Sequence, residues 1–159
     1  MVETETVERM PDWADKIIDN KLSKKADESI EAQKDAIAVA EASRIETLLR
    51  QQMEESVKQF SCAIGGVEGP VTSSLNGYTR FRTVKMPLRV VEFSFVQARI
   101  LFKTHDQLSL ASPFTSSDGI IRIRGEFNAE PWFEYNGRRL NTIEEVSELL
   151  LRPLFESAG

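Results

Sequence analysis

The sequence predicts an α+β fold with a long N-terminal helix, a four- or five-stranded, mainly antiparallel sheet, and a C-terminal amphipathic helix. Residues 1–64 contain no glycine and a single proline, Pro11, whereas all eight glycines and five of the six prolines follow. Turn dipeptides and β-branched or aromatic runs are confined to that second part. We therefore expect a flexible lead-in at 1–11, a helical arm at 12–60, a Gly/Ser connector at 61–77 and a sheet–helix body at 78–159.

Pro11 and Asp12 are typical of a helix start, and no strong stop follows before Phe60. Two alternatives remain for this arm: one continuous helix, or two helices with a break near residues 19–23. Apolar side chains recur at helical spacing, but they drift around the helix and do not form a strict heptad pattern. The members of this stripe are Leu22, Ala26, Ile30, Ile37, Ala40, Ile45, Leu48, Met53, Val57 and Phe60.

The length of the arm bears on assembly. A continuous helix over 12–60 would span about 70 Å, whereas a domain of about 100 residues has a radius of gyration near 13 Å. An unbroken arm therefore needs a second copy to cover its stripe, and we expect a homo-oligomer. A broken arm would instead fold back on the body as an antiparallel pair. The candidate interface residues are Trp13, Ile30, Ile37, Ile45 and Leu48.

Strands are expected at 78–85, 90–103, 120–127, 132–135 and 138–140, and a short strand at 107–111 is left open. The short turns between them favour antiparallel pairing. The apolar face of the run 90–103 switches near Val96 and Gln97, which indicates a bulge or a bend. His105 and Asp106 are interpreted as a turn. Asn136-Gly137 predicts a tight hairpin.

The C-terminal helix is predicted by local signals. Thr142 and Glu145 have the spacing of a capping box. Apolar residues from Ile143 to Phe155 then follow a helical period, and Pro153 is expected to weaken or end the helix in its last turn.

Composition restricts the class of protein. The 159 residues carry a formal net charge of −5 and a pI near 5.1, which argues against a general nucleic-acid binder. Cys62 is the only cysteine, which excludes an intrachain disulfide and fits a reducing compartment. Residues 1–10 lack the features of a signal peptide, and no run is apolar enough to span a membrane. We expect a cytoplasmic protein without membrane partners.

Four arginines form the most informative cluster. Arg80 with Arg82, and Arg122 with Arg124, are two residues apart, so each pair projects from one face of its strand. Together they are candidates for binding an anionic ligand, either a nucleotide or nucleic acid. The favoured alternative is an ordinary solvated face whose arginines pair with neighbouring carboxylates. A third interpretation is that this face receives the acidic arm of another copy.

No residue pattern predicts a catalytic, cofactor or metal site. The segment Gly65–Gly69 lacks the lysine and hydroxyl residue of a phosphate-binding loop. His105 and Cys62 have no evident orienting partner. A structural zinc site needs about four cysteine, histidine or carboxylate ligands, and a single cysteine with a single histidine argues against one. The leading hypothesis is a non-enzymatic protein-interaction module that self-associates through its N-terminal helix. Anionic-ligand binding on the arginine face is the alternative, and an enzyme with a site assembled only in three dimensions is the weaker one.

Overall fold

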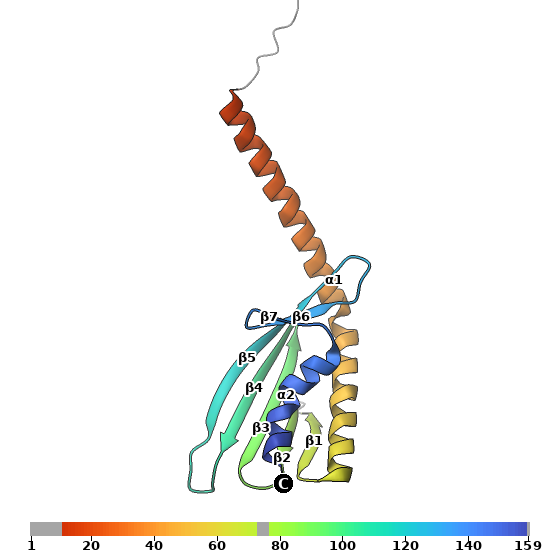
Figure 1. Cartoon of the computed structure of the whole chain (residues 1–159), viewed down its shortest axis with the longest axis vertical. Coiled ribbons are helices and arrows are strands. Elements are labelled where there is room, and N and C mark those ends of the chain that lie inside the picture. Colours follow the sequence, from red (N-terminus) through yellow and green to blue (C-terminus); the bar gives the residue numbers. More distant parts are fainter. Residues whose placement is uncertain (1–10, 73–76, 159) are drawn as a thin grey trace, which may run out of the picture. The chain divides into compact units, whose positions relative to one another are not determined.

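The α+β class, the long first helix, the antiparallel sheet and the final helix are confirmed by a computed structural model, which describes residues 11–72 and 77–158. Residues 1–10 of the lead-in predicted at 1–11, and residues 73–76 of the predicted connector with the turn residue Asn76, lie outside the described residues. In chain order the elements are α1 (Asp12–Ala63), β1 (Val67–Thr72), β2 (Thr79–Thr83), β3 (Leu88–Val96), β4 (Arg99–Gln107), β5 (Thr115–Arg124), β6 (Trp132–Tyr135), β7 (Arg138–Leu140) and α2 (Ile143–Ser157), as Figure 1 shows.

The chain divides into two compact units, residues 1–33 and residues 34–159. In the first unit, residues 12–33 are helical throughout, and none of their side chains is buried. The carbonyl oxygen of Pro11 accepts hydrogen bonds from the amides of Ala14 (2.9 Å) and Asp15 (3.2 Å), which opens the helix. The helix then runs through residues 19–23 without the break that the sequence left open.

In the second unit, the described strands form one antiparallel sheet in which each strand pairs with its neighbour in sequence. The predicted number of four or five strands is wrong, because the sheet has seven. One missed strand, β1, lies in the segment expected to be a connector, and a bulge accommodates its Gly69 and Pro70. The expected bend near Val96 is a complete turn at Gln97 and Ala98, which divides one predicted strand into β3 and β4.

The turn predicted at His105 and Asp106 is also wrong. Both residues belong to β4 and pair with Ser116 and Thr115 of β5. Eight consecutive pairs hold β4 and β5 together, so the chain stays extended for longer than the local sequence suggests. The actual turn follows in residues 108–114, where the sequence had suggested a short strand.

The helices cover one face of the sheet. Figure 1 shows α2 lying across this face with the C-terminal part of α1 beside it. The buried side chains of α1 are Ala38, Ala42, Ile45, Leu49, Met53 and Val57, so only part of the expected stripe faces this core. Phe60 of α1 stacks on Phe155 of α2 with ring centroids 4.2 Å apart, which joins the two helices. Aromatic and aliphatic side chains from β2 to β7 complete the core, among them Phe81, Phe93, Ile100, Ile121, Phe133 and Leu140.

A glycine allows α1 to approach the end of the sheet. Gly125 follows β5 directly, and a Cβ atom at this position would lie 2.2 Å from the carbonyl oxygen of Lys34 and 2.9 Å from the amide nitrogen of Ala38. Both are backbone atoms of the helix, so a side chain could not be accommodated without moving the backbone. α1 therefore packs here against glycine, the one residue type that permits such a close approach.

Two local predictions near the C-terminus are confirmed. Asn136 and Gly137 have φ values of 50° and 75°, as a tight hairpin turn requires. The hydroxyl oxygen of Thr142 accepts a hydrogen bond from the amide of Glu145 (3.2 Å) and caps α2. Pro153 lies inside α2, which continues beyond it to Ser157.

Candidate functional site

The four arginines singled out from the sequence lie on the face of the sheet that the helices leave uncovered. In β2, Phe81 is buried, whereas Arg80 and Arg82 on either side of it are exposed. In β5, the buried residues Ile121 and Ile123 alternate with Arg122 and Arg124. Because side chains alternate between the faces of a strand, all four guanidinium groups belong to the same face of the sheet, which we call the outer face.

The two arginine pairs do not form one cluster. Across the sheet, Arg80 is in register with one residue of β3, one of β4 and, in β5, Asp118. Asp118 comes four residues before Arg122 along β5. With strands about 4.8 Å apart and a rise of about 3.4 Å per residue, Arg80 and Arg122 are separated by roughly 20 Å. The outer face therefore carries two separate arginine groups with different surroundings.

Carboxylates neutralise the first group. Arg80 donates from Nε to Glu92 Oε1 over 2.7 Å, and its Nη2 lies 2.5 Å from the same oxygen. Arg82 forms an ion pair with Glu68 of β1. This arrangement is the cross-strand pairing expected of an ordinary polar sheet face.

His105 lies beside this first group and takes part in a short polar chain. Its Nδ1 is 2.7 Å from Ser116 Oγ, and its Nε2 is 3.7 Å from Glu92 Oε2. The order serine, histidine, carboxylate is that of a nucleophilic site, but 3.7 Å exceeds a hydrogen bond, so Glu92 does not orient the imidazole as such chemistry requires. A hollow of about 370 Å³ lies over this region. Its lining residues are Arg80, Arg82, Leu88, Val90, Glu92, His105 and Phe114.

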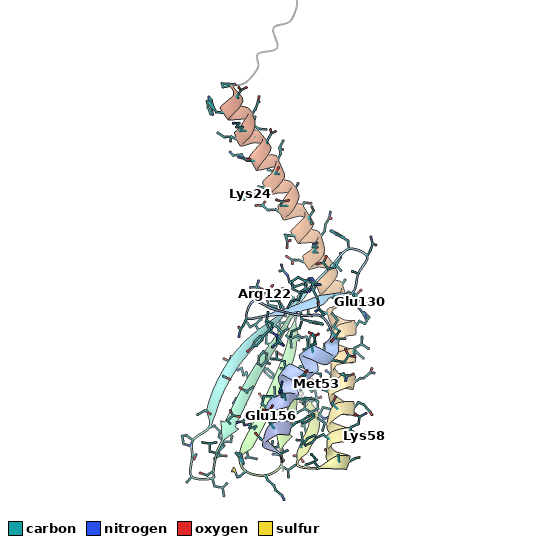
Figure 2. All side chains as sticks on the ribbon, in the orientation of Figure 1. Lys24, Met53, Lys58, Arg122, Glu130 and Glu156 are labelled. Carbon is teal, nitrogen blue, oxygen red and sulfur yellow. The ribbon has the colours of Figure 1, made fainter. Side chains whose placement is uncertain are left out.

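Trp132 lies beside Arg124 of the second arginine group. The guanidinium of Arg139 lies 4.3 Å from the centroid of the Trp132 ring, and that of Arg124 lies 5.7 Å from it. Glu134 Oε2 lies 3.7 Å from Arg124 Nε. Arg99 of β4 stands directly opposite Arg122 of β5. Figure 2 labels Arg122 on the ribbon.

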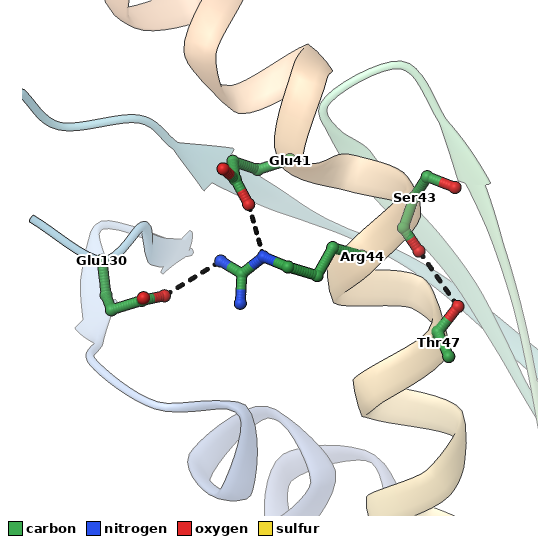
Figure 3. A network of polar contacts seen from close by, with 5 residues as sticks. All are labelled: Glu41, Ser43, Arg44, Thr47 and Glu130. Atoms are coloured by element: carbon green, nitrogen blue, oxygen red, sulfur yellow. Dashed lines mark hydrogen bonds and ion pairs between the residues drawn. The ribbon is translucent and has the colours of Figure 1, made fainter.

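A further polar network on α1 was not predicted from the sequence. Arg44 donates from Nε to Glu41 Oε2 (2.5 Å) and from Nη2 to Glu130 Oε2 (3.0 Å), and a neighbouring bond joins Thr47 to the carbonyl oxygen of Ser43 (Figure 3). These two acceptors raise the pKa of Arg44, with the hydrogen bond to Glu41 as the larger cause. The network borders a hollow of about 360 Å³ between α1 and the start of α2.

The interface candidates differ in their surroundings. Trp13 and Ile30 are exposed, with 67% and 43% of their surface accessible. Ile37 is half-buried, and Leu48 is exposed at the edge of the hollow beside Arg44. Ile45 is 2% exposed and belongs to the core of its own chain, so its packing partners are intramolecular.

Among residues 11–72 and 77–158, no group of three or more histidine, cysteine, aspartate or glutamate side chains is arranged to hold a metal ion. In the same described ranges, no helix is long and apolar enough to cross a bilayer. Cys62 is exposed in the last turn of α1. Comparisons with protein-family models, with curated proteins and with solved structures gave no significant match, so the function has to be inferred from the residues of this chain.

Proposed function

We propose that the protein is a non-enzymatic, cytoplasmic interaction module that self-associates through the helical segment 12–33. The observation that carries the proposal is an uncharged helix face in residues 22–33 of this segment, on which no side chain is buried. The single, free cysteine supports a reducing compartment such as the cytoplasm.

Charged and uncharged residues are cleanly separated around the helix between residues 22 and 33. With 3.6 residues per turn, the charged residues all lie roughly 100° or more from Ala26 around the helix axis. These charged residues are Lys24, Lys25, Asp27, Glu28 and Glu31. The face within roughly 60° of Ala26 is uncharged. Its members are Leu22, Ser23, Ala26, Ser29, Ile30 and Gln33.

This face exposes large apolar groups. Leu22 is 59% exposed and Ile30 is 43% exposed. Helices in proteins gain most of their stability from packing an apolar face, not from helix propensity alone. The segment therefore has both a surface suited to packing and a thermodynamic reason to pack.

The partner that this face fits best is a second copy of the same segment. Leu22, Ala26 and Ile30 are four residues apart and form one ridge, and two such ridges interdigitate when helices cross at about −50°. In an antiparallel pair centred on Ala26, the small side chains meet at the crossing point, and Leu22 of each copy faces Ile30 of the other. Such a contact is self-complementary, as a two-fold dimer requires.

The expected contribution of this contact is moderate. Burying a leucine or isoleucine completely is worth about 1.5–3 kcal/mol, and about half of each side chain remains to be buried. The four side chains of a dimer would then contribute on the order of 3–6 kcal/mol. Replacing Leu22 in both copies should weaken the dimer on the order of 10–100-fold.

Sedimentation of the full chain over a range of concentrations tests the proposal. As the concentration rises toward the millimolar range, the wild type should shift from monomer to dimer, and Leu22→Glu or Ile30→Glu should keep it closer to the monomer. Lys24→Glu is the matched control, because it introduces the same residue on the opposite side of the same helix. A wild type that stays monomeric at high concentration, or a control that dissociates as readily as Leu22→Glu, would contradict the proposal.

A further inference from the structure

The second arginine group borders a small hollow at the end of the sheet. The hollow has a volume of about 200 Å³ and lies where the β3–β4 turn approaches α1. Three of its lining residues are arginines, namely Arg99, Arg122 and Arg124, and Asp35 of α1 contributes a carboxylate. All of these residues belong to the second unit, 34–159.

Arg99 and Arg122 form an unusual cross-strand pair. Opposite charges face each other at the other charged pairs of the outer face, such as Arg80 with Glu92, Lys103 with Asp118, and Glu134 with Arg139. Arg99 and Arg122 instead bring two positive charges together. Like charges directly opposite each other destabilise a sheet.

The backbone geometry brings these two side chains particularly close. The amide of Ile123 donates to the carbonyl oxygen of Ala98 over 2.8 Å, so this neighbouring pair is hydrogen-bonded. Pairs alternate along an antiparallel ladder, which makes Arg99 and Arg122 a non-hydrogen-bonded pair with Cα atoms about 4.5 Å apart. The two arginine side chains therefore project from the same part of the sheet surface.

The surrounding carboxylates do not neutralise this pair. Among the described residues, neither Arg99 nor Arg122 forms an ion pair. Glu134 is opposite Arg122 in the register, but its carboxylate is within 3.7 Å of Arg124. Arg124 already has Glu134 beside it, so at the hollow Asp35 supplies one negative charge against the two positive charges of Arg99 and Arg122.

We propose that this hollow binds a phosphate group, as free phosphate or as the phosphomonoester end of a small molecule. Guanidinium groups present several N–H donors in a fixed plane and match phosphate oxygens well. A dianion would relieve the repulsion between Arg99 and Arg122, neither of which forms an ion pair with a carboxylate of the described chain. The size of the hollow favours a single phosphate group over an extended polymer. The neutralised arginine group around Arg80 lies roughly 20 Å away, so it is a separate surface.

The proposal assigns opposite roles to the residues at the hollow. Arg99 and Arg122 provide the donors, so replacing either by glutamine should weaken phosphate binding at least tenfold, as loss of a charged hydrogen bond does. Asp35 repels the dianion, so Asp35→Asn should strengthen binding. Arg80→Gln is the matched control, since it removes the same charge from the same sheet face, outside the hollow.

Titration of the isotope-labelled full chain with sodium phosphate at constant ionic strength provides the test, with NMR shifts at the amides of Gln97 and Ala98 as the signal. We expect saturable shifts that Arg122→Gln and Arg99→Gln weaken, that Arg80→Gln leaves within twofold and that Asp35→Asn strengthens. A parallel titration with a nucleoside monophosphate distinguishes a phosphomonoester ligand from free phosphate.

Three results would overturn the phosphate site. The first is the absence of saturation with both phosphate probes at tens of millimolar. The second is equal weakening by Arg80→Gln and Arg122→Gln, which indicates general charge screening. The third is binding of a single-stranded oligonucleotide that is tighter than phosphate binding and depends equally on both arginine groups, which indicates a polymer surface. Thermal unfolding without phosphate checks the electrostatic premise, because Arg122→Gln should then raise the unfolding temperature.

Discussion

Replacing Gly125 by alanine is expected to destabilise the second unit more than any ordinary surface substitution. The new Cβ would lie 2.2 Å from the carbonyl oxygen of Lys34, whereas ordinary van der Waals contacts of a Cβ begin at 3.4 Å. The helix or the end of β5 must move by about 1 Å to relieve the clash. Overpacking that shifts the backbone costs about 1–3 kcal/mol and occasionally more, and we expect about 3 kcal/mol here.

Thermal or denaturant unfolding measures this effect. For a chain of this size, about 3 kcal/mol corresponds to a loss of roughly 6–12 °C in Tm. Gly137→Ala is the control, because a Cβ there meets no atom within 4 Å and only the positive φ of 75° opposes it. That strain alone should cost about 1–2 kcal/mol. If Gly125→Ala is no more destabilising than Gly137→Ala, α1 does not approach the sheet as closely as described.

Two further predictions concern side-chain contacts of the second unit. The hydrogen bond from Trp132 Nε1 lowers the pKa of Glu126 below its ordinary value of 4.5, so the stabilisation it gives is complete above that value and is lost as pH falls through the folded-state pKa. The difference in Tm between the wild type and Glu126→Gln should therefore be constant above about pH 5.5 and shrink below pH 4.5, and a difference independent of pH would refute this. For Phe60 and Phe155, a double-mutant cycle of alanine substitutions followed by urea unfolding should give a coupling of about 0.5–1.5 kcal/mol, whereas additive losses would mean that the rings do not interact.

Local signals predicted the parts of the fold that depend on a few adjacent residues. Asn136-Gly137 specifies its turn through backbone conformation, and Thr142 with Glu145 specifies the start of α2 through side-chain hydrogen bonds. The turn at Gln97 had no such signal, because a glutamine with a φ of 55° is an uncommon choice that tertiary packing imposes. β1 had no local signal either, because its glycine and proline are typical of a loop. Its pairing with β2 is what makes this segment a strand.

The surfaces were harder to predict than the elements. Alternation along β2 and β5 correctly predicted that Arg80 shares a face with Arg82, and Arg122 with Arg124, because this depends only on the period of a strand. Their division into two groups depends on the register across β3 and β4, which the sequence does not display. The importance of Arg99 follows from the same register, since only the pairing places it opposite Arg122.

The order of elements along the chain has a consequence for synthesis. Each strand pairs with the strand made just before it, so the sheet can grow as the chain leaves the ribosome. The contacts of α1 form later, because Phe60 stacks on Phe155 and the helix packs against Gly125, and both of these residues are made after most of the sheet. At typical rates of translation, the 95 residues from Phe60 to Phe155 take on the order of ten seconds to make, so the two rings cannot stack earlier. Apolar surface that is exposed in such an interval favours aggregation over folding.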